Sequence, residues 1–204
     1  LFRVHSTSPS YLIMESIDNT YAFIWENPQL MARWKEKCLE LKNSLGSKVN
    51  LVDTIDPTRI VFGADGYTGY ELQKLYRDKG IIAEMADMEN IVFLTSLYDI
   101  ESIDLIGKID LEKRKPLKMD FSVPLGGKYM DISRVKHKPV KTIYYKEAKG
   151  MVSYNAIGAY PPGVAAVMPG EVITEEIIDY IERILSYGGK FFSIENEMIQ
   201  VIDI

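Results

Sequence analysis

The sequence is poor in the residues that enzymes most often use at metal and nucleophilic centres. Its 204 residues include one cysteine, Cys38, and two histidines, His5 and His137, which lie far apart in the chain. One cysteine cannot form an internal disulfide, and these three positions lack the spacing of zinc ligands or of a cysteine–histidine pair. We therefore predict no metal site and no self-contained catalytic set, and the low cysteine content favours a reducing compartment.

Several other features are missing as well. The glycine patterns that cradle phosphates, GxGxxG and GxxxxGKS/T, do not occur, and no apolar run is long enough to span a bilayer. Acidic residues outnumber basic ones, 29 to 24, so the chain lacks the basic excess that nucleic acids and anionic membranes attract. We therefore expect a cytoplasmic globular protein with no nucleic-acid partner and no membrane partner.

The first part of the chain predicts two helices. Ser8 is a good N-cap with Pro9 at the first helical position, and a second helix is predicted over residues 28–45, between Asn27 and Gly46. The apolar positions of the first helix recur at helical spacing and predict one buried face, formed by Leu12, Ile13, Ile17, Tyr21 and Ile24.

Strand and helix signals then alternate up to about residue 114. The pattern predicts two strands within 48–65, a helix over 68–79, two strands within 81–96 and a helix within 99–115. This order suggests an open α/β sandwich in a small compact domain.

The rest of the chain divides into an arm and a second structured part. Residues 115–141 contain three prolines, a glycine pair and many basic residues, which is typical of a linker or extended arm. The pattern then predicts a short helix over 145–150, an apolar strand over 164–168, a capped helix from Thr174 and a hairpin-like tail. The predicted fold class is α/β (α+β).

The stretch YPPGVAAVMPGE, residues 160–171, holds an acid stiffly beside apolar surface. Its three prolines and two glycines predict a turn on each side of an apolar strand, so that Glu171 projects from a fixed point. A carboxylate held in this way is suited to reading a cation through charge-assisted hydrogen bonds. It is equally suited to a place just before the helix at Thr174, where the helix dipole favours an acid, and the pattern does not decide between these interpretations.

Two polar clusters each have a functional and a structural interpretation. Hydroxyls at the start of the first helix stand where free N–H groups attract phosphate, although a simple cap at Ser8 is the commoner explanation. In EMADMEN, residues 84–90, acids could face a ligand or form a charged turn between two strands. These acids are Glu84, Asp87 and Glu89.

Four segments, in this order along the chain, resemble the pyridoxal-phosphate-dependent ornithine/lysine/arginine decarboxylases, and most nearly the shorter bacterial arginine decarboxylases. They are TSPSYLIMESID (7–18), DPTRIVF (56–62), TGYELQKLYRDKGIIAEMAD (68–87) and EAKGMVSYNAIGAYPPGVAAVMPGEVITEE (147–176). Together they span essentially the whole chain, and the last segment is the most specific.

The resemblance implies that this chain is the C-terminal portion of a fold-type I enzyme. Residues 1–114 would be the small domain of the aminotransferase-like fold, an open sheet with helices on one side. Residues 115–141 would be the arm, and 142–204 the family's C-terminal α+β domain. The domain with the cofactor lysine would precede Leu1, so this chain alone is expected to bind no pyridoxal phosphate and to be inactive. The intact enzyme is expected to be a homodimer or a higher homo-oligomer.

The resemblance also implies roles for individual residues in the intact enzyme, where the cofactor accepts electrons as the substrate loses its α-carboxylate. Glu171 is implied to face the guanidinium or ammonium group of a basic amino acid, and Tyr160 in the same motif is implied to bind substrate. The hydroxyls implied to reach the cofactor phosphate of the neighbouring subunit are those of Ser6, Thr7, Ser8 and Ser10.

The expected function is decarboxylation of a basic amino acid, arginine before lysine or ornithine, to make a polyamine precursor. Met151 and Ala159 stand where the family usually has a basic residue and a proline, which makes substrate choice the weakest part of the resemblance. One alternative is a non-catalytic binding or dimerisation module derived from the same family. Another is an aminotransferase half, which needs an arginine for the α-carboxylate and could use Arg114, Arg134 or Arg183.

Overall fold

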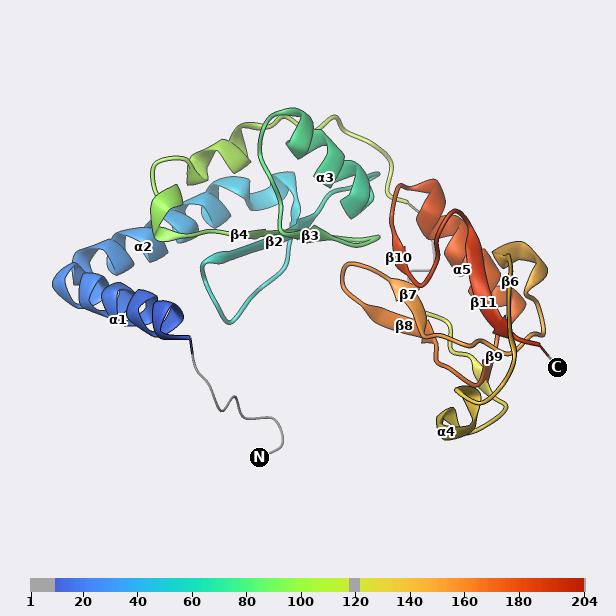
Figure 1. The fold of residues 1–204 in the computed structure, drawn as a ribbon. Coiled ribbons are helices and arrows are strands. Elements are labelled where there is room, and N and C mark those ends of the chain that lie inside the picture. Colours follow the sequence, from blue (N-terminus) through green and yellow to red (C-terminus); the bar gives the residue numbers. More distant parts are fainter. Residues whose placement is uncertain (1–9, 118–121, 204) are drawn as a thin grey trace.

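The computed structural model describes residues 10–117 and 122–203, which form a mixed α+β structure with small antiparallel sheets (Figure 1). The two largest hydrophobic cores lie one mainly in each half of the chain. Within these ranges, none of the helices combines the length and the apolar character needed to cross a membrane.

Two consecutive helices, α1 (Tyr11–Glu26) and α2 (Pro28–Leu45), open the described part of the chain. The bounds of α2 are those predicted, with Asn27 as N-cap and Gly46 as C-cap. The N-cap of α1 is Ser10 rather than the predicted Ser8, and the Ser10 side chain makes no capping hydrogen bond. Ser8 itself lies outside the described residues.

The apolar face of α1 is exposed, so the prediction that it is buried is wrong for the described part of the chain. No residue of α1 is buried, and Ile17 and Tyr21 are 58% and 73% exposed. The exposed large apolar side chains of the helix are Tyr11, Leu12, Ile13, Met14, Ile17, Tyr21, Phe23 and Trp25. An isolated helix of this length is marginal in water, because most helical stability comes from packing of an apolar face.

The first sheet has four antiparallel strands in the order β1-β2-β4-β3. They are β1 (Asn50–Leu51), β2 (Arg59–Gly63), β3 (Met85–Ala86) and β4 (Ile91–Leu94). Helices α2 and α3 (Gly69–Asp78) lie over one face of this sheet, together with the 3-10 helix η4 (Ile103–Lys108) (Figure 1). The strand residues buried beneath them are Ile60, Phe62, Ile91 and Phe93. Two short 3-10 helices, η2 (Gly46–Lys48) and η3 (Leu97–Asp99), complete this half.

Antiparallel pairing makes this half α+β rather than the α/β sandwich that the element order suggested. Strands β3 and β4 form a hairpin, and Asp87 closes its turn because Oδ1 accepts hydrogen bonds from the N–H groups of Glu89 and Asn90. Strand β4 therefore inserts between β2 and β3, antiparallel to both. The helix predicted within 99–115 is the 3-10 helix η4, followed by irregular chain.

The second half packs three small antiparallel sheets with helix α5 (Glu175–Ser186). The sheets have the orders β10-β7-β8, β11-β6 and β5-β9. The strands are β5 (Gly127–Lys128), β6 (Val140–Tyr144), β7 (Ile157–Ala159), β8 (Val164–Val167), β9 (Glu171–Val172), β10 (Phe191–Phe192) and β11 (Met198–Ile202). Helix α4 (Ile132–Val135) and the 3-10 helix η5 (Tyr145–Glu147) are short. As predicted, Thr174 caps α5, where its hydroxyl accepts a hydrogen bond from the Ile177 N–H.

Two predictions about the second half need correction. The helix predicted over 145–150 is the short 3-10 helix η5. The predicted hairpin-like tail is present only at its turn, where Glu195 and Met198 form an antiparallel bridge, because β10 pairs with β7 and β11 pairs with β6. Between these strands the backbone is left-handed at Ser193, Asn196 and Glu197, with φ of 61°, 50° and 63°, and these bends redirect the chain to a second sheet.

The two halves share a core. Tyr70 at the start of α3, with Ala86 and Met88 from the β3–β4 hairpin, packs into the cluster built mainly by residues of the second half. Gly189 makes room for this contact, since a Cβ there would lie 2.8 Å from the ring of Tyr70. The tip of the β3–β4 hairpin is therefore held against the second half of the chain (Figure 1).

The capping box of α3 provides a test of this packing. Thr68 is fully buried, its hydroxyl accepts from the Glu71 N–H, and the Glu71 carboxylate accepts from the Thr68 N–H at 2.8 Å. We predict that Thr68→Ala lowers the free energy of unfolding, measured by urea denaturation, by about 1–2 kcal/mol. Thr20→Ala, which removes an exposed hydroxyl on α1, should change it by less than about 0.5 kcal/mol. Equal effects of the two substitutions would contradict the capping role.

Candidate functional site

Glu171 is held by the turn that precedes it. Pro169 and Gly170 occupy the corner of the turn, and Gly170 has a φ of 88°, the left-handed value that favours glycine at the third position of a type II turn. The Glu171 N–H donates to the Met168 carbonyl at 3.1 Å, and the Met168 N–H donates to Glu171 Oε2 at 2.8 Å. The carboxylate therefore closes its own turn instead of capping α5, which Thr174 caps.

The Glu171 carboxylate has no cationic partner among residues 10–117 and 122–203. Lys128 is its cross-strand neighbour in the β5–β9 pair, but the ammonium group of Lys128 binds Asp131 at 2.9 Å. The side chain of Glu171 is half-buried, and Gly126 leaves room for it, since a Cβ there would lie 2.9 Å from Oε2. One carboxylate oxygen is thus fixed by a backbone N–H, while the charge remains uncompensated.

Exposed apolar residues lie next to the strand pair that carries this acid. Leu125 is 82% exposed, and Tyr129 and Met168 are also exposed. Leu125 and Tyr129 flank the short strand β5 that pairs with β9, and the Tyr129 N–H donates to the Gly170 carbonyl at 3.0 Å. A cation with an aliphatic stem would find both charge and apolar surface here.

Tyr160 lies at the other end of strand β8 from Glu171. Its N–H donates to the Lys190 carbonyl at 2.8 Å, and its side chain is 62% exposed in the turn between β7 and β8. The four residues of β8 separate the two positions by about 13 Å along the strand. The structure therefore does not bring Tyr160 and Glu171 together.

Ser10 is the one residue of the predicted phosphate cluster that the structure describes; Ser6, Thr7 and Ser8 lie outside the described residues. The Ser10 side chain is exposed and makes no capping hydrogen bond. One exposed hydroxyl does not make a pyridoxal phosphate site, so the described residues do not by themselves fit this cofactor.

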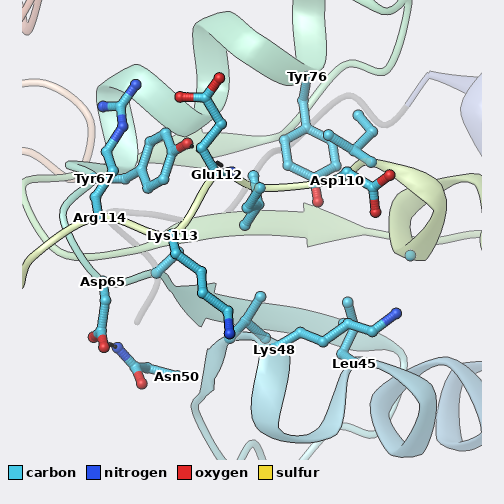
Figure 2. A pocket seen from close by; sticks show the side chains of 15 residues that line it. Leu45, Lys48, Asn50, Asp65, Tyr67, Tyr76, Asp110, Glu112, Lys113 and Arg114 are labelled. Atoms are coloured by element: carbon cyan, nitrogen blue, oxygen red, sulfur yellow. Dashed lines mark hydrogen bonds between the residues drawn. The ribbon is translucent and has the colours of Figure 1, made fainter.

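A polar hollow of the first half was not predicted from the sequence. It has a volume of about 460 Å³ and lies between the end of α2, the loop after β2 and residues 109–114 (Figure 2). Figure 2 shows Arg114 beside the ring of Tyr67, where the guanidinium carbon is 3.8 Å from the ring centroid. Lys48 and Lys113 also line the hollow, as do Asp110 and Glu112, so charges of both signs face it and no one class of ligand is favoured.

The remaining candidates have structural partners. The Arg114 guanidinium also contacts the Glu71 carboxylate at 3.3 Å, so Arg114 is already engaged by an acid and an aromatic ring. Cys38 is buried in the first core beside the Thr95 hydroxyl at 3.3 Å, and burial raises the pKa of its thiol. Among the described residues, no three histidines, cysteines or acids gather as metal ligands would.

Comparison with known proteins finds similarity to decarboxylases. Residues 130–200 match the family described as Orn/Lys/Arg decarboxylase, C-terminal domain. The uncharacterized protein YaaO of Bacillus subtilis is 28% identical over 91% of this chain and 43% of its own length. The arginine decarboxylase of the same organism is 25% identical over 92% of this chain and 44% of its own length.

A solved structure supports the fold. The constitutive lysine decarboxylase of E. coli matches 99% of this chain and 45% of its own with a TM-score of 0.65 and 18% sequence identity, which is a likeness of fold. The chain thus spans less than half the length of the curated relatives that it matches most fully. Residues 130–200 are an Orn/Lys/Arg decarboxylase C-terminal domain, and the chain as a whole is homologous to the C-terminal part of the Bacillus arginine decarboxylases.

Proposed function

We propose that this chain is the C-terminal portion of a pyridoxal-phosphate-dependent decarboxylase of basic amino acids, with arginine favoured over lysine and ornithine. The observation that carries the proposal is the carboxylate of Glu171, which is rigidly held and lacks a cationic partner among the described residues. Homology to the arginine decarboxylase of B. subtilis over nine-tenths of the chain supports the choice of substrate class.

The proposed role of Glu171 is to bind the cationic group at the end of the substrate side chain. Because the Met168 N–H fixes Oε2, the carboxylate keeps its orientation before the substrate arrives, and little side-chain entropy is lost on binding. A guanidinium or ammonium group can then form a charge-assisted hydrogen bond with the carboxylate. The exposed apolar side chains beside it suit the aliphatic stem of such a substrate.

Tyr160 remains a proposed substrate contact, but it would serve a different part of the site. A basic amino acid is shorter than the length of β8 that separates Tyr160 from Glu171. One substrate molecule would therefore meet one of these side chains in a given subunit.

We further propose the division of the chain into a small domain of the aminotransferase-like fold (1–114), an arm (115–141) and the C-terminal domain (142–204). The separate core of the first half, under helices on one side of an open sheet, supports the first unit. The cofactor and its lysine would be held by an upstream domain, and the enzyme would be a homodimer or higher homo-oligomer in which Ser6, Thr7, Ser8 and Ser10 approach the cofactor phosphate of a neighbouring subunit.

Glu171→Gln in the enzyme that contains this chain tests the substrate assignment. The amide oxygen of Gln can still accept from the Met168 N–H, so the turn is kept while the charge is lost. We expect the KM for the basic amino acid to rise at least about 30-fold, since removing one partner of such a charge pair costs roughly 2–5 kcal/mol. Cofactor binding, followed by absorbance, should be unchanged.

Glu175→Gln is the matched control, because Glu175 is an exposed acid four residues away that pairs with Lys149 at the surface. It should leave the KM within about twofold of the wild-type value. An unchanged KM for Glu171→Gln, or the same increase for both variants, would reject Glu171 as the residue that reads the cation.

The exposed apolar face of α1 suggests that another protein surface packs against it. We expect the upstream domain to cover Ile13, Ile17 and Tyr21, because an apolar helix face is stable when packed against other protein. In hydrogen exchange, the amides of α1 should exchange at least about tenfold more slowly in the full-length protein than in the 204-residue chain. Ile17→Asp should remove this protection, and Asn19→Asp, which adds the same charge on the polar side of the helix, should not. Protection that rises with the concentration of the 204-residue chain would instead indicate a second copy as the cover.

A further inference from the structure

A small cavity lies where the two halves of the chain meet. Its volume is about 110 Å³, and its wall combines Asp87 and Glu89 from the β3–β4 turn, Tyr70 from α3 and Tyr180 from α5. Pro162, from the turn between β7 and β8, and Val164, the first residue of β8, also line it. Figure 1 shows the tip of the β7–β8 hairpin directed toward the β3 end of the first sheet. The acidic turn and the proline-rich stretch that the sequence singled out therefore meet at one cavity.

Two largely buried tyrosines line this cavity, and their hydroxyl groups have no hydrogen-bond partner in the described part of the chain. Tyr70 and Tyr180 are 8% and 5% exposed, so each side chain is more than nine-tenths buried. No polar side-chain atom that is sealed from solvent lacks a partner among the described residues, so these hydroxyl oxygens must open onto accessible space. Both side chains also line the cavity.

The carboxylate of Asp87 is a third group that can still accept a hydrogen bond. Its Oδ1 accepts from the N–H groups of Glu89 and Asn90 at 2.8 Å and 2.7 Å, which fixes the carboxylate in the turn. Its Oδ2 has no hydrogen bond with any described residue. Burial is the main cause that raises the pKa of Tyr70 and of Tyr180, and the charge of Asp87 adds to both increases, yet Asp87 is hydrogen-bonded to neither phenol. Three residues that carry oxygen groups thus line one cavity.

The charge of the cavity favours a cation. Its lining includes two acids, Asp87 and Glu89, and no lysine or arginine. The guanidinium of Arg183 lies over the ring of Tyr180, 6.0 Å from its centroid. Burial, before the effect of nearby charges, raises the pKa of Tyr70 to about 12, so this phenol is neutral at physiological pH and can accept a hydrogen bond from a cationic donor.

The size and the apolar walls favour an organic cation over a metal ion. At about 30 Å³ for each water molecule, the volume corresponds to roughly three to four waters. Ala159, Val164 and Ile184 form apolar walls, which suit methylene groups and offer no oxygen ligands to a metal ion. Aromatic faces beside an ammonium group add cation–π attraction.

We propose that this cavity binds the primary ammonium end of a linear alkylamine, with Asp87 as the counter-ion and the hydroxyls of Tyr70 and Tyr180 as acceptors. The site is separate from Glu171 and does not depend on the proposed decarboxylation. Because its walls come from both halves of the chain, an amine bound there would stabilise their junction.

The test uses the intact protein and 1,4-diaminobutane as the probe, with binding followed by calorimetry and by NMR of the tyrosine rings. We expect saturable binding that shifts the resonances of Tyr70 and Tyr180, and no comparable binding of the neutral analogue 1-butanol. Asp87→Asn keeps an acceptor oxygen for the turn and removes the charge, so it should weaken binding at least tenfold. Tyr180→Phe and Tyr70→Phe, which keep the rings, should each weaken it at least threefold.

Asp179→Asn is the matched control, since it removes an exposed acid from the same helix that carries Tyr180 and should leave binding within twofold. Absence of saturable binding, or binding that Asp87→Asn leaves unchanged, would overturn the proposal. Equal weakening by Asp87→Asn and Asp179→Asn would also overturn it, because that result indicates general attraction to an acidic surface. A protein that releases carbon dioxide from basic amino acids but fails these tests would reject the amine site alone.

Discussion

The hydrogen bond from the Met168 N–H to the carboxylate of Glu171 is the interaction on which the proposed function depends. It ties an acid to the corner of its own turn, where Gly170 adopts a left-handed backbone and lacks a side chain beside the Met130 carbonyl. A Cβ on Gly170 would lie 2.6 Å from that carbonyl oxygen, so the position is restricted to glycine by space as well as by backbone angle. Pro169 and Gly170 thus fix the position of the Glu171 carboxylate at the surface.

This arrangement explains why an acid can remain without a cationic partner in a region that contains a lysine. Lys128 is directly across the β5–β9 pair, but it binds Asp131 within its own segment. The backbone N–H stabilises the Glu171 carboxylate without neutralising its charge. Exposed apolar residues, Leu125, Tyr129 and Met168, lie near it in the chain or along the β5–β9 pair, and the face of α1 in the first half is also apolar and exposed. Both surfaces are of the kind that a larger protein covers.

Local features could be predicted well from the sequence. The bounds of α2, the start of α3 near Thr68, the cap at Thr174 and the turn at Pro169 and Gly170 follow from capping and turn preferences that act over a few residues. The failures concern partners that are distant in the sequence. Helical spacing indicated an apolar face on α1 but not whether anything covers it, and the strand signals in the tail did not reveal that β10 and β11 join different sheets.

The candidate sites show the same contrast between local features, which the sequence predicts, and contacts between distant segments, which it does not. The prolines and glycines around Glu171 indicated a rigid backbone. The hydrogen bond between Glu171 and the Met168 N–H, and the separation of Glu171 from Tyr160, became evident only from the positions of β8 and β9. Asp87 was a candidate from its acidic turn, but no local pattern indicated that Tyr70 and Tyr180, 110 residues apart, would line the same cavity. The hollow beside Tyr67 and Arg114 likewise arises from chain segments that meet through the first core.

The central claim is that this chain supplies substrate recognition to a decarboxylase whose cofactor domain lies upstream. The most direct measurement is the release of labelled carbon dioxide from carboxyl-labelled arginine, lysine and ornithine, by the full-length gene product and by the 204-residue chain, each with pyridoxal phosphate. The account predicts release by the full-length protein, fastest with arginine, and none by the 204-residue chain. Release by the 204-residue chain alone, or no release by the full-length protein with any of the three amino acids, would contradict it.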